Sequence, residues 1–287
     1  MENTNKNNPF PGLDTETQEQ SLESGEKKAL YLLSTDTLGG YGLDLIFEVA
    51  KEVGFEGIDL AIWKNFDARN IDYVKRLSAK YQLPVKVIQT SASVNTKEMN
   101  QALDLCYALG TKVITINAPS FFDFSAYNFI IENISKLKKE NPDIKFSIIN
   151  PVVGNIFALP VPKFRFANVV DIIKKFGCYL GFDVANVDEN TLEGEFMRKI
   201  DRFTPHMSVV YFSDKTKLGE GHVIPGEGVL KLTTILKKLR QFNYRNMISL
   251  KLSINKKDLA DTEKVTLILK KCRSFHKDYF ENITVDL

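Results

Sequence analysis

The sequence VVYFSDKTKLGEGHVIPGEG, residues 209–228, decides the fold. An apolar run ends at Asp214 and opens into a polar loop that contains His222. The loop closes on a Pro-Gly-x-Gly sequence, and apolar residues at helical spacing follow it, with Leu232, Ile235, Leu236 and Leu239. A buried strand, a polar loop and a helix in that order form the repeating unit of α/β proteins.

The same unit recurs along the chain from residue 29. Most of the short apolar runs are apolar on both faces, as a strand covered by helices must be. They predict strands at residues 29–35, 57–62, 84–90, 112–119, 145–151, 179–187, 207–213 and 247–253. Helical spacing fills the gaps, and Gly54, Gly110 and Gly177 stand where a left-handed residue ends a helix. Residues 256–280 predict a C-terminal helix.

Eight strands, each followed by a helix, predict an α/β fold with a single (β/α)8 TIM barrel over residues 27–287. A doubly wound open sheet is the alternative. It needs a phosphate-binding glycine turn after the first strand, and Gly39-Gly40-Tyr41-Gly42 lacks the required spacing. In a barrel, the site is expected at the carboxyl ends of the strands.

Residues 1–26 differ from the rest in composition. They are polar with few large apolar side chains, which predicts a disordered N-terminal tail. The alternative is a docking peptide around Phe10-Pro11-Gly12-Leu13. The tail lacks the basic start and apolar centre of a signal peptide, so we expect a cytoplasmic protein.

Composition narrows the function classes. A net charge of +2 argues against nucleic-acid and membrane partners, and no apolar run reaches the roughly 18 residues that span a bilayer. The three cysteines, Cys106, Cys178 and Cys272, lie far apart among apolar residues, which predicts buried free thiols.

Several segments resemble one family. Gly54-Phe55-Glu56-Gly57-Ile58-Asp59-Leu60 is similar to the GFDGVEL segment of the xylose isomerase-like TIM barrels. That superfamily contains sugar and sugar-phosphate isomerases and epimerases, and the AP endonucleases of family 2. Its fourth-strand, sixth-strand and seventh-strand motifs resemble residues 108–111, residues 180–183 and the segment 211–228. The likeness extends over residues 29–255.

The resemblance implies a divalent metal held by Glu, Asp, His and Glu on the fifth to eighth strands. These positions carry Ile149, Asp183, Tyr211 and Lys251, so only the Asp is kept. Further family histidines correspond to Asn186 and Asn117, and a loop Asp corresponds to Glu220, whereas His222 matches. The residues at these positions therefore fit poorly with the metal-dependent catalysis that the resemblance implies.

The physical consequence is electrostatic. An aliphatic group offers no lone pair, a phenol is protonated near neutral pH, and an ammonium repels a cation. We therefore predict no metal and no other cofactor. A buried lysine needs a counter-charge, which leads to the hypothesis that Lys251 takes the place of the metal and pairs with Asp183. The alternative is that Lys251 points outward.

Three functions stay open at this point. The first is a divergent, non-catalytic barrel that binds a small carbohydrate-like or phosphorylated ligand, with either a monomer or a homodimer allowed. The second is a metal-independent isomerase, epimerase or lyase in which Lys251 acts as base or Schiff-base amine and Tyr211 or His222 donates a proton. The third is a metal enzyme with relocated ligands Asp183, Asp214, Glu220 and His222.

The candidate residues follow from these hypotheses. Those assigned to chemistry are Lys251, Tyr211, His222 and Asp183; those assigned to ligand binding are Gln89, Asn117, Asn150, Asn186, Asp214, Lys215 and Trp63. Phe121, Phe122 and Phe124 are expected to cap the barrel mouth, and Lys217 to add a phosphate contact. Of the other histidines, we expect His206 to be structural and His276 to be exposed.

Overall fold

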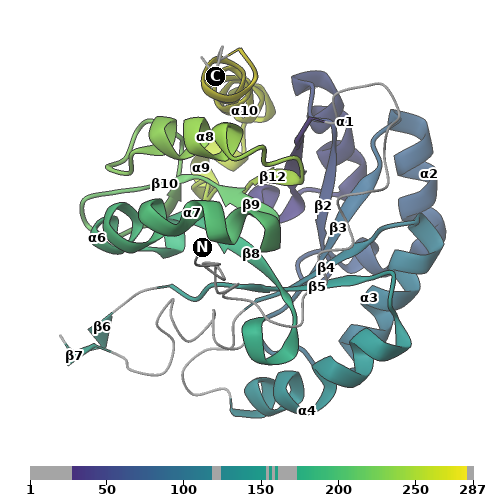
Figure 1. Ribbon diagram of the computed structural model, residues 1–287. Helices are drawn as coiled ribbons and strands as arrows, with labels where there is room; N and C mark the ends of the chain where they lie inside the picture. Colours follow the sequence, from purple (N-terminus) through teal and green to yellow (C-terminus); the bar gives the residue numbers. More distant parts are fainter. Residues whose placement is uncertain (1–27, 118–123, 153–154, 157–158, 161–172, 283–287) are drawn as a thin grey trace, which may run out of the picture.

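Eight parallel strands close into a barrel in the order β1-β12-β9-β8-β5-β4-β3-β2 (Figure 1). The structure is a computed structural model that describes residues 28–117, 124–152, 155–156, 159–160 and 173–282. The barrel strands are β1 (Leu30–Ser34), β2 (Gly57–Ala61), β3 (Val85–Thr90), β4 (Val113–Ile116), β5 (Lys145–Ile149), β8 (Tyr179–Asp183), β9 (Met207–Phe212) and β12 (Met247–Leu250). The predicted TIM barrel is confirmed, and the open-sheet alternative is wrong.

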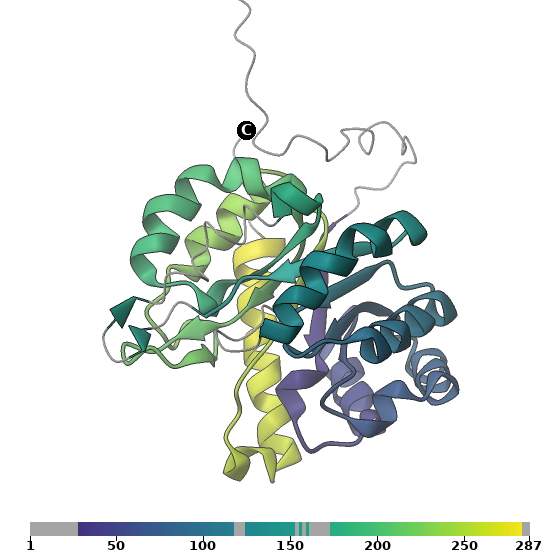
Figure 2. The same ribbon diagram turned by 90° about the horizontal axis from the view of Figure 1, so that it is seen from below.

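Helices surround the barrel (Figure 1). They are α1 (Leu43–Val53), α2 (Ile71–Tyr81), α3 (Thr96–Leu109), α4 (Phe124–Glu140), α6 (Glu189–Thr191), α7 (Met197–Phe203), α8 (Leu232–Gln241), α9 (Lys256–Leu259) and α10 (Thr262–His276). The C-terminal helix α10 packs beside α1, so the last helix closes the ring against the first (Figure 2). Two short hairpins pair β6 (Asn155–Ile156) with β7 (Leu159–Pro160), and β10 (Asp214–Lys215) with β11 (Gly221–Val223).

The helix ends follow the predicted glycines. Gly54 ends α1 with φ of 87°, and Gly110 ends α3 with φ of 68°, both left-handed conformations in which a Cβ atom is strained. Residues 173–176 are helical and run into Gly177, where φ is 60°.

The interior of the barrel is packed with side chains. Six buried residues from five strands form a cluster separate from the main core: Leu32, Val87, Val113, Ile149, Val209 and Tyr211. Gly181 faces this cluster, because a Cβ atom added there would lie 3.0 Å from Ile149 and 3.6 Å from the Tyr211 ring. Ile149 and Tyr211 thus fill the barrel centre beneath the strand ends.

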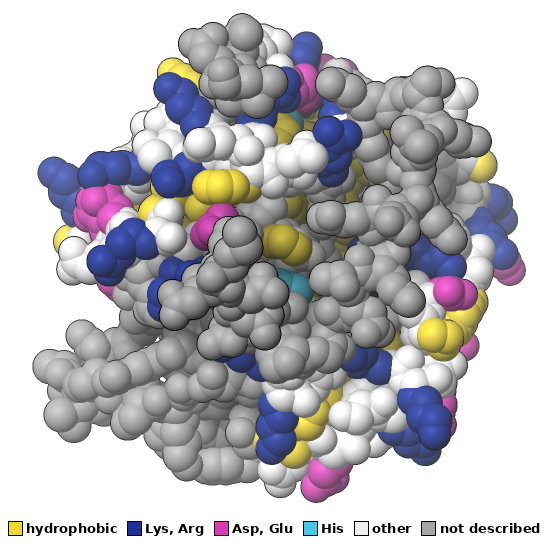
Figure 3. Space-filling view, viewed as in Figure 1, with side chains coloured by type: hydrophobic (Ala, Val, Ile, Leu, Met, Phe, Trp, Pro, Cys, Tyr) yellow, Lys and Arg dark blue, Asp and Glu magenta, His cyan; other side chains and the backbone are white. Residues whose placement is uncertain are grey.

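The three cysteines are free and buried, as predicted. On the face seen in Figure 3, Lys and Arg side chains are scattered among acidic and apolar side chains rather than gathered in one stripe. None of the described helices combines the length and apolar character required to cross a membrane. The predicted N-terminal tail and its Phe10–Leu13 segment lie outside the described residues.

The expectation that His276 is exposed is wrong. Its side chain is fully buried, and its ring stacks on Tyr31 of β1 at a centroid distance of 4.0 Å. The His276 Nδ1 atom lies 3.2 Å from a nitrogen of Arg273 and 3.3 Å from Glu281. The π-helix Lys277–Glu281, which continues α10, carries that Glu281 carboxylate to the imidazole.

Candidate functional site

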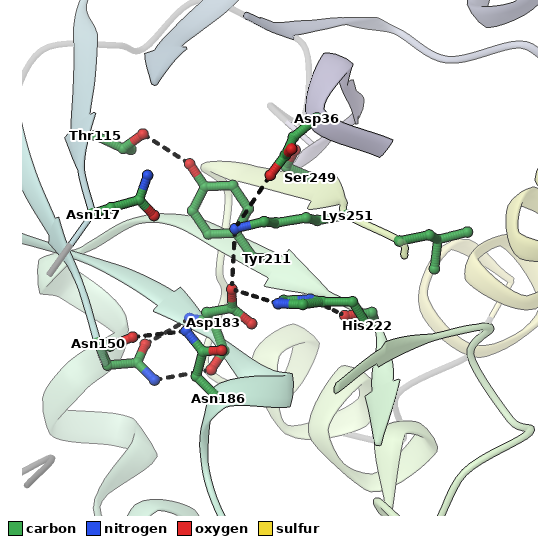
Figure 4. A network of polar contacts seen from close by, with 12 residues as sticks. Asp36, Thr115, Asn117, Asn150, Asp183, Asn186, Tyr211, His222, Ser249 and Lys251 are labelled. Atoms are coloured by element: carbon green, nitrogen blue, oxygen red, sulfur yellow. Dashed lines mark hydrogen bonds and ion pairs between the residues drawn. The ribbon is translucent and has the colours of Figure 1, made fainter. Parts of the chain in front are cut away.

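Asp183 and Lys251 meet where the barrel strands end. Asp183 is the last residue of β8, and Lys251 follows β12 directly. The Lys251 Nζ lies 3.7 Å from Asp183 Oδ2 and 3.9 Å from Asp36 Oδ2, so the ammonium stands between two carboxylates (Figure 4). The Lys251 side chain is only 12% exposed. The predicted Lys251–Asp183 pair is confirmed, and the outward-pointing alternative is wrong.

Asp36 reaches the site from the short 3-10 helix η2 (Thr35–Leu38). Two threonine hydroxyls fix this turn to its neighbours: Thr35 accepts a hydrogen bond from a backbone N–H of β2, and Thr37 donates one to the last carbonyl of β12. The Asp36 carboxylate is therefore held over the barrel end. Sequence reasoning missed this residue, because an Asp in a polar turn gives no signal of its own.

Trp63 lies on the loop after β2 and is 36% exposed. The Lys64 ammonium lies 4.5 Å from the centre of the Trp63 ring, and it also pairs with Asp36 at 3.0 Å. Trp63 is therefore linked through Lys64 and Asp36 to Lys251.

His222 comes from the β10–β11 hairpin and points at the same aspartate. Its Nε2 lies 3.7 Å from Asp183 Oδ2, and its Nδ1 lies 3.0 Å from the Ser213 hydroxyl (Figure 4). The His222 carbonyl accepts a hydrogen bond from Ser253 N at 2.8 Å. The φ of His222 is 63°, a conformation that costs about 1 kcal/mol or more in a residue other than glycine. The surrounding contacts hold the ring against Asp183 despite this strain.

Tyr211 lies under the ammonium. The Lys251 Nζ is 5.3 Å from the centre of its ring, and the Tyr211 hydroxyl shares a 2.8 Å hydrogen bond with Thr115 (Figure 4). Burial raises the pKa of the Tyr211 phenol well above its usual value, and the charge of Asp59 adds to the shift. Tyr211 is therefore a neutral phenol whose ring face favours a cation.

Asp59 is a buried acid on β2 that sequence reasoning missed. Its Oδ2 accepts a hydrogen bond from the Ser249 hydroxyl at 2.9 Å. Burial raises the pKa of Asp59 to about 7, against the opposing effects of Ser249 and the Lys251 charge. A signal was available in the strand pattern: Asp59 lies on the same face as the small residues Gly57 and Ala61, opposite to the face of Ile58 and Leu60.

Three of the predicted amide side chains form hydrogen bonds with backbone groups at the strand ends. Asn150 binds the backbone of Asp183 twice, accepting from its N–H at 2.7 Å and donating to its carbonyl at 2.9 Å. Asn186 in turn donates to the Asn150 carbonyl at 2.9 Å. Asn117 donates to the carbonyl of Thr90 at 2.7 Å. These three predicted ligand-binding residues hold strand ends in place.

Gln89 is the exception among the amides. It is fully buried on β3, and both of its polar atoms lack a hydrogen bond within the described part of the chain. The same holds for both carboxylate oxygens of Asp183 and for Oδ1 of Asp59. Buried polar groups are nearly always hydrogen-bonded, so this group of free atoms indicates a place for a ligand or for water.

Asp214 and Lys215 organise the loop. The Asp214 carboxylate accepts hydrogen bonds from the backbone N–H groups of Lys215, Gly226, Gly228 and Leu230. Lys215 donates to the Val187 carbonyl at 3.0 Å, and burial lowers its pKa. Both were predicted as ligand-binding residues. The Asp214 carboxylate is used within the loop, and the Lys215 ammonium joins the loop to Val187 after β8, so both side chains make structural contacts.

The remaining predicted residues are the phenylalanines expected at the barrel mouth, two charged loop residues and His206. Phe121 and Phe122 lie outside the described residues, as does the side chain of Phe124. Lys217 and Glu220 are exposed, away from the buried Asp183. His206 lies in the turn before β9, and burial lowers its pKa to about 4.

The positions to which the family resemblance assigns metal ligands do not suit a divalent ion. They hold one carboxylate, a neutral phenol, an aliphatic side chain and an ammonium 3.7 Å from that carboxylate. Within the described ranges, no group of three or more His, Cys, Asp and Glu is arranged to hold a metal. The alternative set of metal ligands, which includes Asp214 and Glu220, also does not form one site. The Asp214 carboxylate already accepts hydrogen bonds from backbone N–H groups, and Glu220 is exposed.

Comparisons with known proteins agree with this fold. An uncharacterized protein of Methanocaldococcus jannaschii is 23% identical over 224 residues, covering 70% of this chain and 74% of that protein. A D-allulose 3-epimerase from Methylomonas sp., solved with D-allulose, superposes with a TM-score of 0.64 at 15% identity, over 88% of this chain and 98% of that one.

A xylose isomerase domain containing protein from Salmonella typhimurium superposes with a TM-score of 0.66 at 14% identity, again over 88% of this chain and 98% of that one. At such identities these likenesses establish the fold. The family model described as "Xylose isomerase-like TIM barrel" matches residues 47–272, which is most of the chain and contains β2 to β12. This chain therefore belongs to the xylose isomerase-like TIM barrel family.

Proposed function

We propose that this protein binds a small carbohydrate-like ligand, a sugar or a sugar phosphate, at the carboxyl ends of its strands and without a divalent metal. The observation that carries the proposal is the Lys251 ammonium 3.7 Å from Asp183. A fixed cation at this place can hold a ligand oxygen, as a metal ion would, without needing further anionic ligands.

The surroundings support a polyhydroxylated ligand. Free buried oxygens on Asp183 and Asp59 and a free amide on Gln89 offer hydrogen bonds of both kinds. Trp63 adds an exposed aromatic surface near the same end of the barrel. Small-molecule sites combine such apolar surfaces with a few convergent polar groups.

The test combines metal analysis with ligand binding. Purified full-length protein is measured for bound metals by mass spectrometry, then dialysed against chelator and titrated calorimetrically with a panel of sugars and sugar phosphates. We expect less than stoichiometric divalent metal, and binding of at least one compound that chelator leaves unchanged. Lys251→Met should abolish this binding, whereas Lys270→Met, which removes an exposed lysine paired with Glu52, should retain it.

Binding that disappears on chelation and returns with added metal would overturn the proposal, as would a panel without a single ligand. A stoichiometric divalent ion in the purified protein would also count against it.

A second candidate is a metal-independent isomerase, epimerase or lyase. The observation favouring it is the group of proton carriers beside the cation: Asp59, with a pKa of about 7, and His222, 3.7 Å from Asp183. General acid–base catalysis works best with groups that titrate near the working pH. Incubation of bound sugars in D2O separates the candidates, because enzyme-dependent deuterium incorporation at carbon, seen by NMR, requires proton transfer.

The Schiff-base version has its own test. The Lys251 Nζ is engaged by two carboxylates, at 3.7 and 3.9 Å, whereas a Schiff base requires this nitrogen to leave them and attack a carbonyl carbon. We therefore expect that borohydride in the presence of a bound ketose leaves the protein mass unchanged. An adduct on Lys251 would support covalent catalysis instead.

A further inference from the structure

We infer that the amino end of the barrel, opposite the candidate site, is a docking surface for the acidic segment 14–26 of the same chain. That segment lies outside the described residues. The surface lies where the strands begin and shares no residue with the candidate site, so the two proposals stand or fall separately. It combines an excess of lysines with partly exposed apolar side chains.

Lysines gather where β3, β4, β5 and β8 begin, four strands that are neighbours in the barrel. The residues that lead into these strands, or begin them, include eight lysines: Lys80, Lys86, Lys112, Lys138, Lys139, Lys145, Lys174 and Lys175. Two exposed acids accompany them, with Glu140 3.8 Å from Lys136 and Asp143 4.0 Å from Lys112. Charges of one sign gathered on one face create a field that attracts an oppositely charged segment.

Two of these lysines reach the interior wall of the barrel. A Cβ atom added to Gly57 would lie 3.3 Å from Cγ of Lys86 and 3.1 Å from Leu32, which belongs to the separate cluster inside the barrel. Lys145 lies on the same face of β5 as Ile149, another member of that cluster. Both lysines are partly exposed, so their ammonium groups can be reached from outside.

Apolar side chains lie at the same end of the barrel. Leu30 begins β1 and Met247 begins β12, and both pack against the cluster inside the barrel while staying partly exposed. Tyr179 begins β8, with the centre of its ring 5.1 Å from the Lys145 ammonium. Apolar surface rimmed by charged residues is typical of an interaction site. The surface therefore fits a peptide in which acids flank a large apolar side chain.

Residues 14–26 have that composition. Their sequence, DTETQEQSLESGE, contains five acids, no Lys or Arg, and Leu22 as its one large apolar residue. Acids on both sides of Leu22 can meet the lysines while the leucine covers the apolar floor. Charge and apolar character thus match those of the surface at the amino end.

The segment can also reach this surface. Lys28 precedes β1 and pairs with Glu56 at 2.7 Å just before β2, so the chain enters the barrel at its amino end. Leu22 is six residues earlier, a reach of up to about 20 Å, whereas neighbouring strands lie only about 4.8 Å apart. Linkage to β1 gives the segment a high effective concentration at this surface, which favours it over the segment of a second copy.

The experiment is cross-linking of the full-length protein with a carbodiimide, which joins a carboxylate to an amine that it contacts. An equal mixture of isotope-labelled and unlabelled protein separates bonds within one chain from bonds between two, and mass spectrometry identifies the joined peptides. We expect the acids of residues 14–26 to join Lys86 and Lys145 within one chain, with a yield at least about threefold higher than at Lys277.

Lys277 is the matched control. It is exposed and follows His276, which stacks on Tyr31 of β1, so an undocked segment would reach it as easily as the two interior lysines. The bond between Glu52 and Lys270, which lie 2.7 Å apart, shows in each sample that the reagent has worked.

Leu22→Ser keeps every carboxylate of the segment and should lower the yield at Lys86 and Lys145 by about threefold or more, because an apolar contact is lost. Equal yields at these two lysines and at Lys277, or an unchanged yield in Leu22→Ser, would overturn the inference. Bonds formed mainly between labelled and unlabelled chains would overturn it as well, since the occupant would then be a second copy.

Discussion

The imidazole of His276 stacks on the ring of Tyr31 with 14° between their planes, which ties the last helix of the barrel to its first strand. Around this pair, Arg273 and Glu281 form an ion pair at 2.7 Å, and burial lowers the pKa of His276. Glu281 has its pKa lowered to about 2, chiefly by the hydrogen bond to His276. The closure of the ring therefore depends on groups that titrate.

Acid should loosen this closure. A histidine with a lowered pKa in the fold contributes stability above its unfolded pKa of about 6.5, and that contribution is lost as pH falls through the folded value. We expect the contribution of His276, taken as the free energy of unfolding of wild type minus that of His276→Phe, to fall from pH 7 to pH 5, by up to about 1.4 kcal/mol per pH unit. Urea titrations of wild type and His276→Phe at several pH values measure this. The Phe variant keeps the stacking, so an equally steep fall in it would contradict the assignment.

Loss of the Lys251 charge should leave Asp183 buried without its cation. Removing one partner of a buried ion pair typically costs about 3 kcal/mol or more, so Lys251→Met should lower the free energy of unfolding by roughly that amount. Lys270→Met breaks an exposed pair with Glu52 and should cost less than about 1 kcal/mol. Urea unfolding measures both. A small effect at Lys251, matching that at Lys270, would mean that the site pair is solvated.

Gly228 should not tolerate a methyl group. A Cβ atom there would lie 2.3 Å from Asp214 Oδ1 and 2.3 Å from the Lys215 carbonyl oxygen, and this carboxylate holds four backbone N–H groups of the loop. We expect Gly228→Ala to lower the free energy of unfolding by about 3 kcal/mol. Gly39→Ala is the matched control, since nothing lies within 4 Å of its added Cβ, and it should change stability by less than about 0.5 kcal/mol. Equal melting temperatures for the two variants would refute the clash.

Asp59 should destabilise the fold at neutral and alkaline pH. Its folded pKa, about 7, lies above the usual 3.8, so its favourable contribution is present below pH 3.8 and is lost as pH rises to about 7. The loss is on the order of 4 kcal/mol for a shift of this size. The free energy of unfolding of Asp59→Asn should therefore rise relative to that of wild type between pH 4 and pH 8. For Asp143→Asn, the difference in free energy of unfolding from wild type should stay constant over the same range. A difference between Asp59→Asn and wild type that is independent of pH would contradict the shift.

The strands were predictable because each is an apolar run set between polar loops. The sixth run was predicted too long, since apolar residues continue to Val187 while the strand ends at Asp183 and the chain turns into the 3-10 helix Val184–Asn186. Apolar composition marks burial, and both the strand and the turn after it are buried. The pattern alone therefore cannot place the strand end.

The site was predictable in part. The family resemblance placed Lys251 opposite Asp183, which no local pattern would have done. Asp36 and Asp59 were not predicted, because their roles depend on residues that only the closed barrel brings near them. Asp36 pairs with Lys251 and Lys64, and Asp59 accepts a hydrogen bond from Ser249. Those partners lie far away in sequence, so no spacing rule connects them.

His276 shows a different kind of error. Counting by three and four from Val265 through Leu269 and Cys272 leads to position 276, so the helical repeat itself predicts burial there. The polar character of histidine weighed against that pattern. Its polar partners are the Arg273 guanidinium, from the same helix, and the Glu281 carboxylate, which the π-helix Lys277–Glu281 brings to the imidazole.

Asn150 holds Asp183 by its main chain alone, with both of its hydrogen bonds going to peptide groups. The end of β8 is thus secured independently of the acid that it displays. An exchange of that acid removes the partner of Lys251 but leaves these two backbone hydrogen bonds in place. Position 183 is accordingly a natural entry point for redesign, where a new side chain can be introduced into the barrel mouth without rebuilding its wall.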